Sequence, residues 1–171
     1  VEMHRGGLVA TRLTDTRVVM RTASGTYFVD QGSAERTWVN TPACQGDLNV
    51  NPVSSTFTCT RCTSYRCDQL QVVTHDFSGK ILRRDQVSVP QDLIGCRWDW
   101  APSEGFSEGG FPVRRLLCEG FCAFGELAPP SVRSIRFSRE DCDSPPPEIL
   151  LTAGLRLVPE VEANWAQAQE D

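Results

Sequence analysis

The chain has 171 residues, of which 40% are apolar and 23% charged, and this composition excludes wholesale disorder and predicts one domain with a real core. The formal net charge of −5 argues against nucleic acid or an anionic membrane as the partner, because phosphate contacts need a cationic surface. No stretch approaches the roughly 20 apolar residues of a membrane-spanning helix, so we expect no transmembrane segment.

Strand-forming residues recur in the first third of the chain. Residues 8–30 predict a hairpin, because Val18–Met20 and Thr26–Val29 are rich in β-formers and flank an Ala-Ser-Gly turn. Gly, Pro and Asn recur in residues 31–55, which we therefore expect to be a loop. Thr56–Thr60 alternates polar and apolar residues and predicts a strand.

The middle of the chain contains the clearest hairpin signal. Residues 70–74 and 80–83 are β-forming segments on either side of an Asp-Phe-Ser-Gly turn. His75 adjoins this turn, so we expect it to be solvated and not catalytic. Residues 87–89 predict a third, separate strand that ends at a proline.

A Gly-, Pro- and Ser-rich segment follows at residues 99–112 and carries large aromatic side chains. Tyrosine and tryptophan are preferred anchors of protein interfaces, because they bury a large area at little cost in entropy. The candidate partner-binding residues of this region are Trp98, Trp100, Phe106 and Phe111. The alternative is that they cover an edge of the core, with the two tryptophans lying over a disulfide at Cys96.

The last third of the chain again predicts strands, at residues 113–117 and 132–137, followed by an apolar pair at 148–152 and 155–158. The resulting fold class is mainly β: antiparallel sheets in a sandwich-like single domain over residues 1–159, cross-linked by cysteines and with little helix. Residues 160–171 are expected to be an acidic tail or connector that folding does not need.

The cysteines are even in number and dispersed, and we expect them to be disulfide-bonded: Cys44, Cys59, Cys62, Cys67, Cys96, Cys118, Cys122 and Cys142. Eight cysteines allow 105 pairings, and the sequence does not choose among them. The alternative is one zinc ion held by Cys59, Cys62, Cys118 and Cys122, which have near-knuckle spacing. That site would leave the other four cysteines unexplained, whereas disulfides explain all of them.

The Cys59-x-x-Cys62 pair with Cys67, the later pair Cys118 and Cys122, and the segment 130–137 together resemble the C-terminal regulatory domain of RIG-I-like RNA sensors. The resemblance covers roughly residues 56–142. It implies one zinc ion held by four cysteines and a basic face that binds RNA ends. The chain departs from that family in the spacing of the second pair, in its net charge of −5 and in having a single lysine.

The sequence contains no catalytic constellation that we recognise, so we expect no enzyme, no resident cofactor and no metal. The favoured hypothesis is a secreted or extracellular module, a cell-surface, viral-surface or effector protein, that binds another protein. The alternative hypothesis is an intracellular zinc-stabilised β domain that binds nucleic acid or protein.

Overall fold

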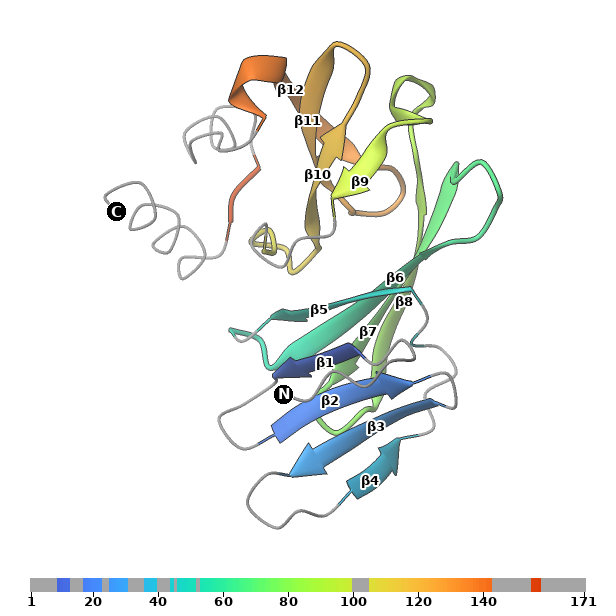
Figure 1. The fold of residues 1–171 in the computed structure, drawn as a ribbon, viewed down its shortest axis with the longest axis vertical. Coiled ribbons are helices and arrows are strands. Elements are labelled where there is room, and N and C mark those ends of the chain that lie inside the picture. Colours follow the sequence, from blue (N-terminus) through green and yellow to red (C-terminus); the bar gives the residue numbers. More distant parts are fainter. Residues whose placement is uncertain are drawn as a thin grey trace, which may run out of the picture. The chain divides into compact units, whose positions relative to one another are not determined.

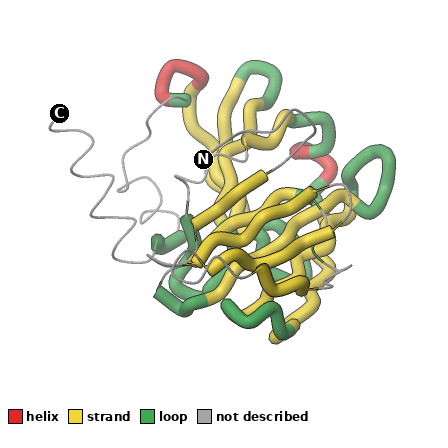
Figure 2. Tube along the Cα trace, turned by 60° about the horizontal axis from the view of Figure 1, so that its bottom comes forward, coloured by secondary structure: helices red, strands yellow, loops and turns green. Residues whose placement is uncertain are grey.

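Strands make up most of the structure, which is a computed structural model of the chain (Figure 2). The residues that it describes are 9–12, 17–22, 25–30, 36–39, 44, 46–51, 53–99, 105–142 and 155–157. Helix within these residues is confined to two short 3₁₀ turns, η1 (Gln91–Leu93) and η3 (Arg139–Asp141). The prediction of an antiparallel β protein with little helix and cysteine cross-links is therefore confirmed.

The strands of the described residues form three four-stranded sheets (Figure 1). The first sheet has the order β1-β2-β3-β4 and contains β1 (Val9–Arg12), β2 (Arg17–Thr22), β3 (Gly25–Asp30) and β4 (Arg36–Val39). The second has the order β5-β6-β7-β8 and contains β5 (Asp47–Asn51), β6 (Thr56–Cys62), β7 (Gln69–Asp76) and β8 (Ile81–Ser88). The third has the order β12-β11-β10-β9 and contains β9 (Arg97–Asp99), β10 (Val113–Leu117), β11 (Phe121–Glu126) and β12 (Arg133–Ser138).

The contacts of the backbone divide the chain into two compact units. The first unit contains Val1–Thr60 with Val73–Arg84, and the second contains Arg61–Val72 with Asp85–Asp171. Strands β6, β7 and β8 each contribute residues to both units. A single domain over residues 1–159 stays a prediction, and its boundary with the acidic tail lies outside the described residues.

Strands β2, β3 and β6 supply the core of the first unit, whose buried residues are Val19, Phe28, Cys44, Phe57 and Cys59. Val19 lies opposite Phe28 in the register of β2 and β3, and Phe57 and Cys59 lie two positions apart on the same face of β6. The rings of Phe28 and Phe57 meet edge to face, with their centroids 6.1 Å apart. This geometry is the one that aromatic quadrupoles favour.

The expectation that His75 is solvated is wrong, because β7 extends through His75 to Asp76 and the imidazole is buried. The Asp76 carboxylate accepts hydrogen bonds from the backbone N–H groups of Ser78 and Lys80, at 2.9 and 3.0 Å. It thereby fixes the start of the turn at Asp76 and leaves His75 inside β7. Both faces of β7 are covered at this end of the strand, and the imidazole is fully buried against the ring of Phe57.

The expected loop at residues 31–55 contains two strands, β4 and β5, and that prediction is wrong as well. Strand β5 pairs with β6, which places Asn49 opposite Thr58 and Asn51 opposite Thr56. The side-chain oxygen of Asn51 accepts the N–H groups of Val53 and Ser54, at 3.1 and 3.4 Å. Asparagine therefore ends the strand here and shapes the following turn, as its side chain does in Asx turns.

Two apolar clusters form the core of the second unit. The larger cluster is made by residues of β7, β8, η1, β10 and β11, and its buried members are Leu70, Val72, Val87, Val89, Leu93, Leu116, Cys118, Ala123, Leu127 and Val132. The smaller cluster contains Val113, Phe124, Leu155 and Leu157. The prediction of a separate strand at residues 87–89 is wrong, because Val87 and Ser88 are the last two residues of β8.

Candidate functional site

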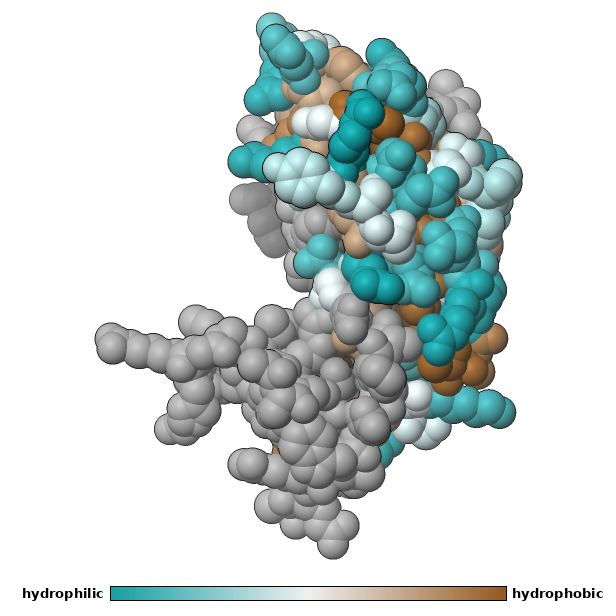
Figure 3. Space-filling model, turned by 90° about the vertical axis from the view of Figure 1, so that its right-hand side faces the viewer, coloured by the Kyte–Doolittle hydropathy of each residue, from teal (hydrophilic) through white to brown (hydrophobic). Residues whose placement is uncertain are grey.

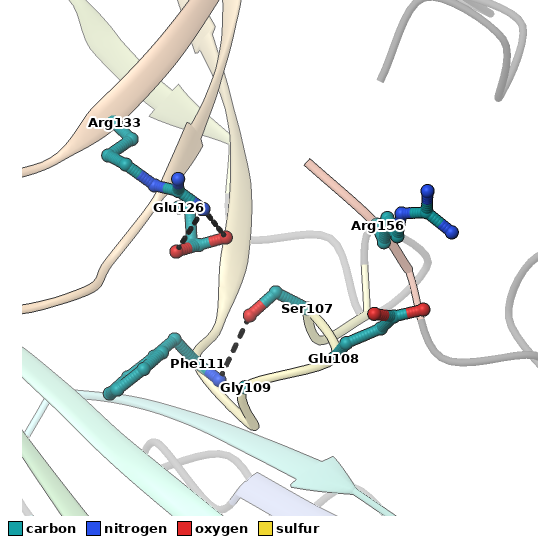
Figure 4. Close-up of a pocket in the computed structure, with 7 residues that line it drawn as sticks. All are labelled: Ser107, Glu108, Gly109, Phe111, Glu126, Arg133 and Arg156. Atoms are coloured by element: carbon teal, nitrogen blue, oxygen red, sulfur yellow. Dashed lines mark hydrogen bonds and ion pairs between the residues drawn. The ribbon is translucent and has the colours of Figure 1, made fainter. Parts of the chain in front are cut away.

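A small pocket lies in the second unit, where a tight turn approaches the ends of β11 and β12 (Figure 4). Its lining residues are Ser107, Glu108, Gly109, Phe111, Glu126, Arg133 and Arg156. The pocket has a volume of about 370 Å³. This volume is at the small end of the range of roughly 300–1,000 Å³ that small-molecule sites occupy.

Hydrogen bonds within the turn fix the position of its side chains. The Ser107 N–H donates to the Phe111 carbonyl and the Gly110 N–H donates to the Ser107 carbonyl, both at 2.9 Å. The Phe111 N–H also donates to the Ser107 hydroxyl oxygen at 3.3 Å. Gly110 has a φ of 81°, a conformation that glycine adopts without steric cost. The Ser107 side chain is thus used to hold the turn together.

The lining of the pocket includes an ion pair between Glu126 and Arg133. The register of β11 and β12 places Glu126 opposite Arg133, and one guanidinium nitrogen of Arg133 donates to both carboxylate oxygens, at 3.0 and 3.1 Å. Glu126 is only 4% exposed, and a buried carboxylate without a cation would be strongly destabilising. The main role of this ion pair is therefore to stabilise the fold. The hydroxyl, carboxylate and guanidinium groups of the lining suit a polar ligand better than an apolar one.

Of the predicted aromatic residues that the structure describes, Phe111 lines this pocket, and Trp98 and Phe106 do not. Trp98 in β9 is half-buried and, like Cys96, packs against the larger core cluster, which contains Cys118. Phe106 is 2% exposed, so its ring is part of the interior. Trp100 lies outside the described residues. Trp98 and Phe106 therefore pack against the core, as the alternative in the sequence analysis proposed. A contact with a partner through the four aromatic residues stays a prediction.

All eight cysteines are disulfide-bonded, as Cys44–Cys59, Cys62–Cys67, Cys96–Cys118 and Cys122–Cys142. The four cysteines of the alternative zinc site belong to four different disulfides. Among the described residues, no group of three or more His, Cys, Asp or Glu side chains is placed to hold a metal ion. A zinc site would require these bonds to be open, and the resemblance to the RNA sensors depends on the same cysteines.

One disulfide differs from the others in its surroundings. Cys62 is exposed and Cys67 is half-buried, and their bond closes a loop at the end of the β6–β7 hairpin. Loop-closure entropy assigns about 2 kcal/mol to a loop this short and about 3 kcal/mol to one of 15–20 residues. The Cys62–Cys67 bond therefore contributes least to global stability, and its main effect is on the shape of the loop.

The side chains of this loop, residues 61–68, are almost all exposed. Tyr65 at its tip is fully exposed, with 105% of its reference area in contact with solvent. The sequence did not single out this loop, because the eight cysteines allow 105 pairings and their count alone does not favour the bond between Cys62 and Cys67. The signal that could have found it is two cysteines five positions apart, with polar residues and a tyrosine between them, at the junction of two strands.

The face of the molecule in Figure 3 carries hydrophilic side chains over most of its described area, with apolar side chains in small groups. No family model matches the chain, and no curated protein and no solved structure matches it either.

Proposed function

We propose that the chain is an extracellular module that acts by binding another protein. The observation that carries this proposal is the pairing of every cysteine in four disulfides. Disulfides form and persist in oxidising compartments, whereas cytosolic thiols are kept reduced. None of the helical segments in the described part of the chain has the length and apolar character of a bilayer crossing.

Protein is the favoured class of partner because of the charge and the surface of the chain. A net charge of −5 disfavours polyanions, and the described residues include an exposed loop that is closed by its own disulfide. Rigid, exposed loops on a β scaffold are common sites of protein recognition, because little entropy is lost when they bind.

The redox state of the chain purified from its native source under non-reducing conditions tests the extracellular part of the proposal. We expect the intact mass of the denatured protein to rise by eight hydrogen atoms on reduction, and elemental analysis to find no stoichiometric zinc. Free thiols together with one zinc ion per chain would instead support the intracellular alternative through Cys59, Cys62, Cys118 and Cys122.

A further inference from the structure

We propose that the loop at residues 61–68 is the principal contact of the chain with its protein partner, and that Tyr65 enters a pocket on that partner whose rim carries carboxylates. This inference rests on the proposed function, because it names the surface through which an extracellular binding module would act.

Tyr65 exposes its whole side chain to solvent. The other exposed large apolar side chains of the described residues, Val53 and Leu82, are 49% and 52% exposed, whereas Tyr65 is 105% exposed. A phenol ring held away from its own protein gains little from the fold and can bury nearly all of its area in a partner. Tyrosine is among the residues that contribute most to protein interfaces, because it combines a large apolar ring with a hydroxyl group.

Hydrogen bonds within the loop order it before it binds. The Thr63 N–H donates to the Gln69 carbonyl at 3.0 Å, and the Cys67 N–H donates to the Ser64 carbonyl at 3.2 Å. The Ser64 hydroxyl donates to the Asp68 carboxylate. The backbone N–H of Asp68 in turn donates to the Ser64 hydroxyl oxygen at 3.3 Å. Together with the disulfide, these bonds leave few backbone conformations to lose on binding, which favours affinity.

The backbone of Cys67 supports the same conclusion. Its φ of 54° lies in the left-handed region, which is unfavourable for a residue with a side chain. Such a conformation persists only where the surrounding structure imposes it, and these positions are frequent at binding sites. Here the disulfide and the Ser64 carbonyl impose it, and the resulting bend places Tyr65 at the tip of the loop.

The charges of the loop indicate the chemistry of the partner. Arg61 and Arg66 are exposed on either side of Tyr65, and the Arg61 Nε donates to the Gln71 side chain at 2.8 Å, which orients its guanidinium group. Asp68 is the single acidic residue of the loop and already accepts the Ser64 hydroxyl. The loop thus carries two arginines and one aspartate on a chain of net charge −5, so a carboxylate-bearing partner would be attracted to the loop, and this attraction would help to orient the encounter.

The test begins with the intact, oxidised chain and an array of purified secreted and cell-surface ectodomains from its own organism. For each ectodomain that binds, the Kd is measured for the native chain and for the variants Tyr65→Ala, Arg66→Glu and Leu82→Ala. Leu82 in β8 is the matched control, because it is an exposed apolar side chain outside the loop. Equal melting temperatures for all variants verify that each one is folded.

We expect Tyr65→Ala to weaken binding by about 30-fold or more, as truncation of an interface anchor does, and Leu82→Ala to change the Kd less than about threefold. Arg66→Glu should slow association, and the Kd of the native chain should rise between about 50 and 500 mM NaCl. Opening the loop with the double change Cys62→Ser and Cys67→Ser should also weaken binding, because the loop would lose its order.

Three other results would contradict the assignment of the loop, the class of partner or the proposed function. If an ectodomain binds and Tyr65→Ala leaves its Kd unchanged, the loop is not the contact and the proposed function stands. If heparin or phosphatidylserine vesicles bind through the loop and ectodomains do not, a protein is the wrong class of partner. If no ectodomain binds the native chain, the proposed function itself fails, and the assignment of the loop fails with it.

Discussion

His75 is a buried titratable side chain that makes the stability of the chain depend on pH. Its imidazole is 0% exposed and stacks on the ring of Phe57, with the centroids 4.7 Å apart and the planes at 5°. Burial lowers its pKa below the ordinary value of 6.5, and the positive charge of Arg84 acts in the same direction. Backbone carbonyl contacts and Asp76 oppose this shift more weakly, so the folded state holds the neutral ring.

We therefore predict that the chain loses stability as the pH falls below about 6.5. The unfolded chain binds a proton at His75 in that range and the folded chain does not, so the free energy of unfolding is largest above it. At pH 5 the loss is at most about 2 kcal/mol, the limit for a ring that stays neutral in the folded state. Urea denaturation at several values between about pH 7.5 and 5 measures the effect.

The chain has two histidines, which supplies a simple control. His75→Phe should remove this pH dependence, because a neutral ring can still stack on Phe57, whereas His4→Gln should leave it unchanged. An equal slope of stability against pH in the native chain and in the His75→Phe variant would show that the buried imidazole is not responsible.

Gly125 is a second residue at which the packing leads to a definite prediction. A Cβ atom at this position of β11 would lie 2.9 Å from Val132 Cγ1 and 3.0 Å from Leu116 Cδ1. Both neighbours are buried core residues with little room to move. We expect Gly125→Ala to destabilise the chain by about 1–3 kcal/mol, the usual cost of overpacking.

The matched control for this variant is Ser134→Ala, because Ser134 is the exposed residue opposite Gly125 in the register of β11 and β12. That change should alter stability by less than about 0.5 kcal/mol. A Gly125→Ala variant as stable as the control, in chemical denaturation, would mean that the core around Val132 adapts freely.

At the scale of whole elements, the sequence predicted strands well where β-branched and aromatic residues were concentrated. The strand expected at residues 113–117 has the bounds of β10, and that expected at 132–137 is β12 shifted by one residue. Strand β5 was missed because its asparagines indicate a loop. Cross-strand pairing and burial of Asn49 and Asn51 override that preference, as tertiary context does for β-strands generally.

The candidate sites were less accessible to sequence reasoning than the strands. Glu126 and Arg133 meet because an antiparallel register places them opposite each other, and their spacing along the chain does not reveal it. The disulfide state could be predicted from the count of cysteines, whereas the pairing requires distances that only the fold supplies. The burial of Phe106 likewise depends on packing beyond its own Gly-rich segment.

The disulfides differ in burial and in the length of the loop that each one closes, so their removal should destabilise the chain by different amounts. Replacing Cys62 and Cys67 by alanine opens an exposed loop and should cost no more than about 2 kcal/mol by loop-closure entropy. Replacing Cys122 and Cys142 opens a loop with a sequence separation of 20 and leaves space at two buried positions. That pair should cost about 3 kcal/mol from loop closure, with a further loss from the cavity.

Urea denaturation of both double variants gives the comparison directly. The Cys122–Cys142 variant should unfold at the lower midpoint, and the slope of the free energy with urea should be checked for changes in the unfolded state. The reverse order would show that the loop at residues 61–68 supports the β6–β7 hairpin more than its exposure suggests.

For the molecule as a whole, the disulfides are distributed unequally between the two units. The first unit contains Cys44–Cys59 and the second contains the other three, and each bond closes within its own unit. Each unit therefore depends on its own covalent constraint, and three of the bonds involve buried core cysteines. Reduction should consequently weaken both units together.

We predict that the fully reduced chain is unfolded at about 37 °C. Each bond contributes about 2–3 kcal/mol by loop closure, and domains of this size are stable by only about 5–15 kcal/mol in total. The measurement is circular dichroism and thermal melting of the chain after reduction and alkylation with iodoacetamide, compared with unreduced chain treated with the same reagent. A reduced and alkylated chain that keeps its melting transition would contradict this prediction. The zinc-stabilised alternative would be favoured if the reduced chain, left unalkylated and under reductant, regained its transition on addition of one zinc ion per chain.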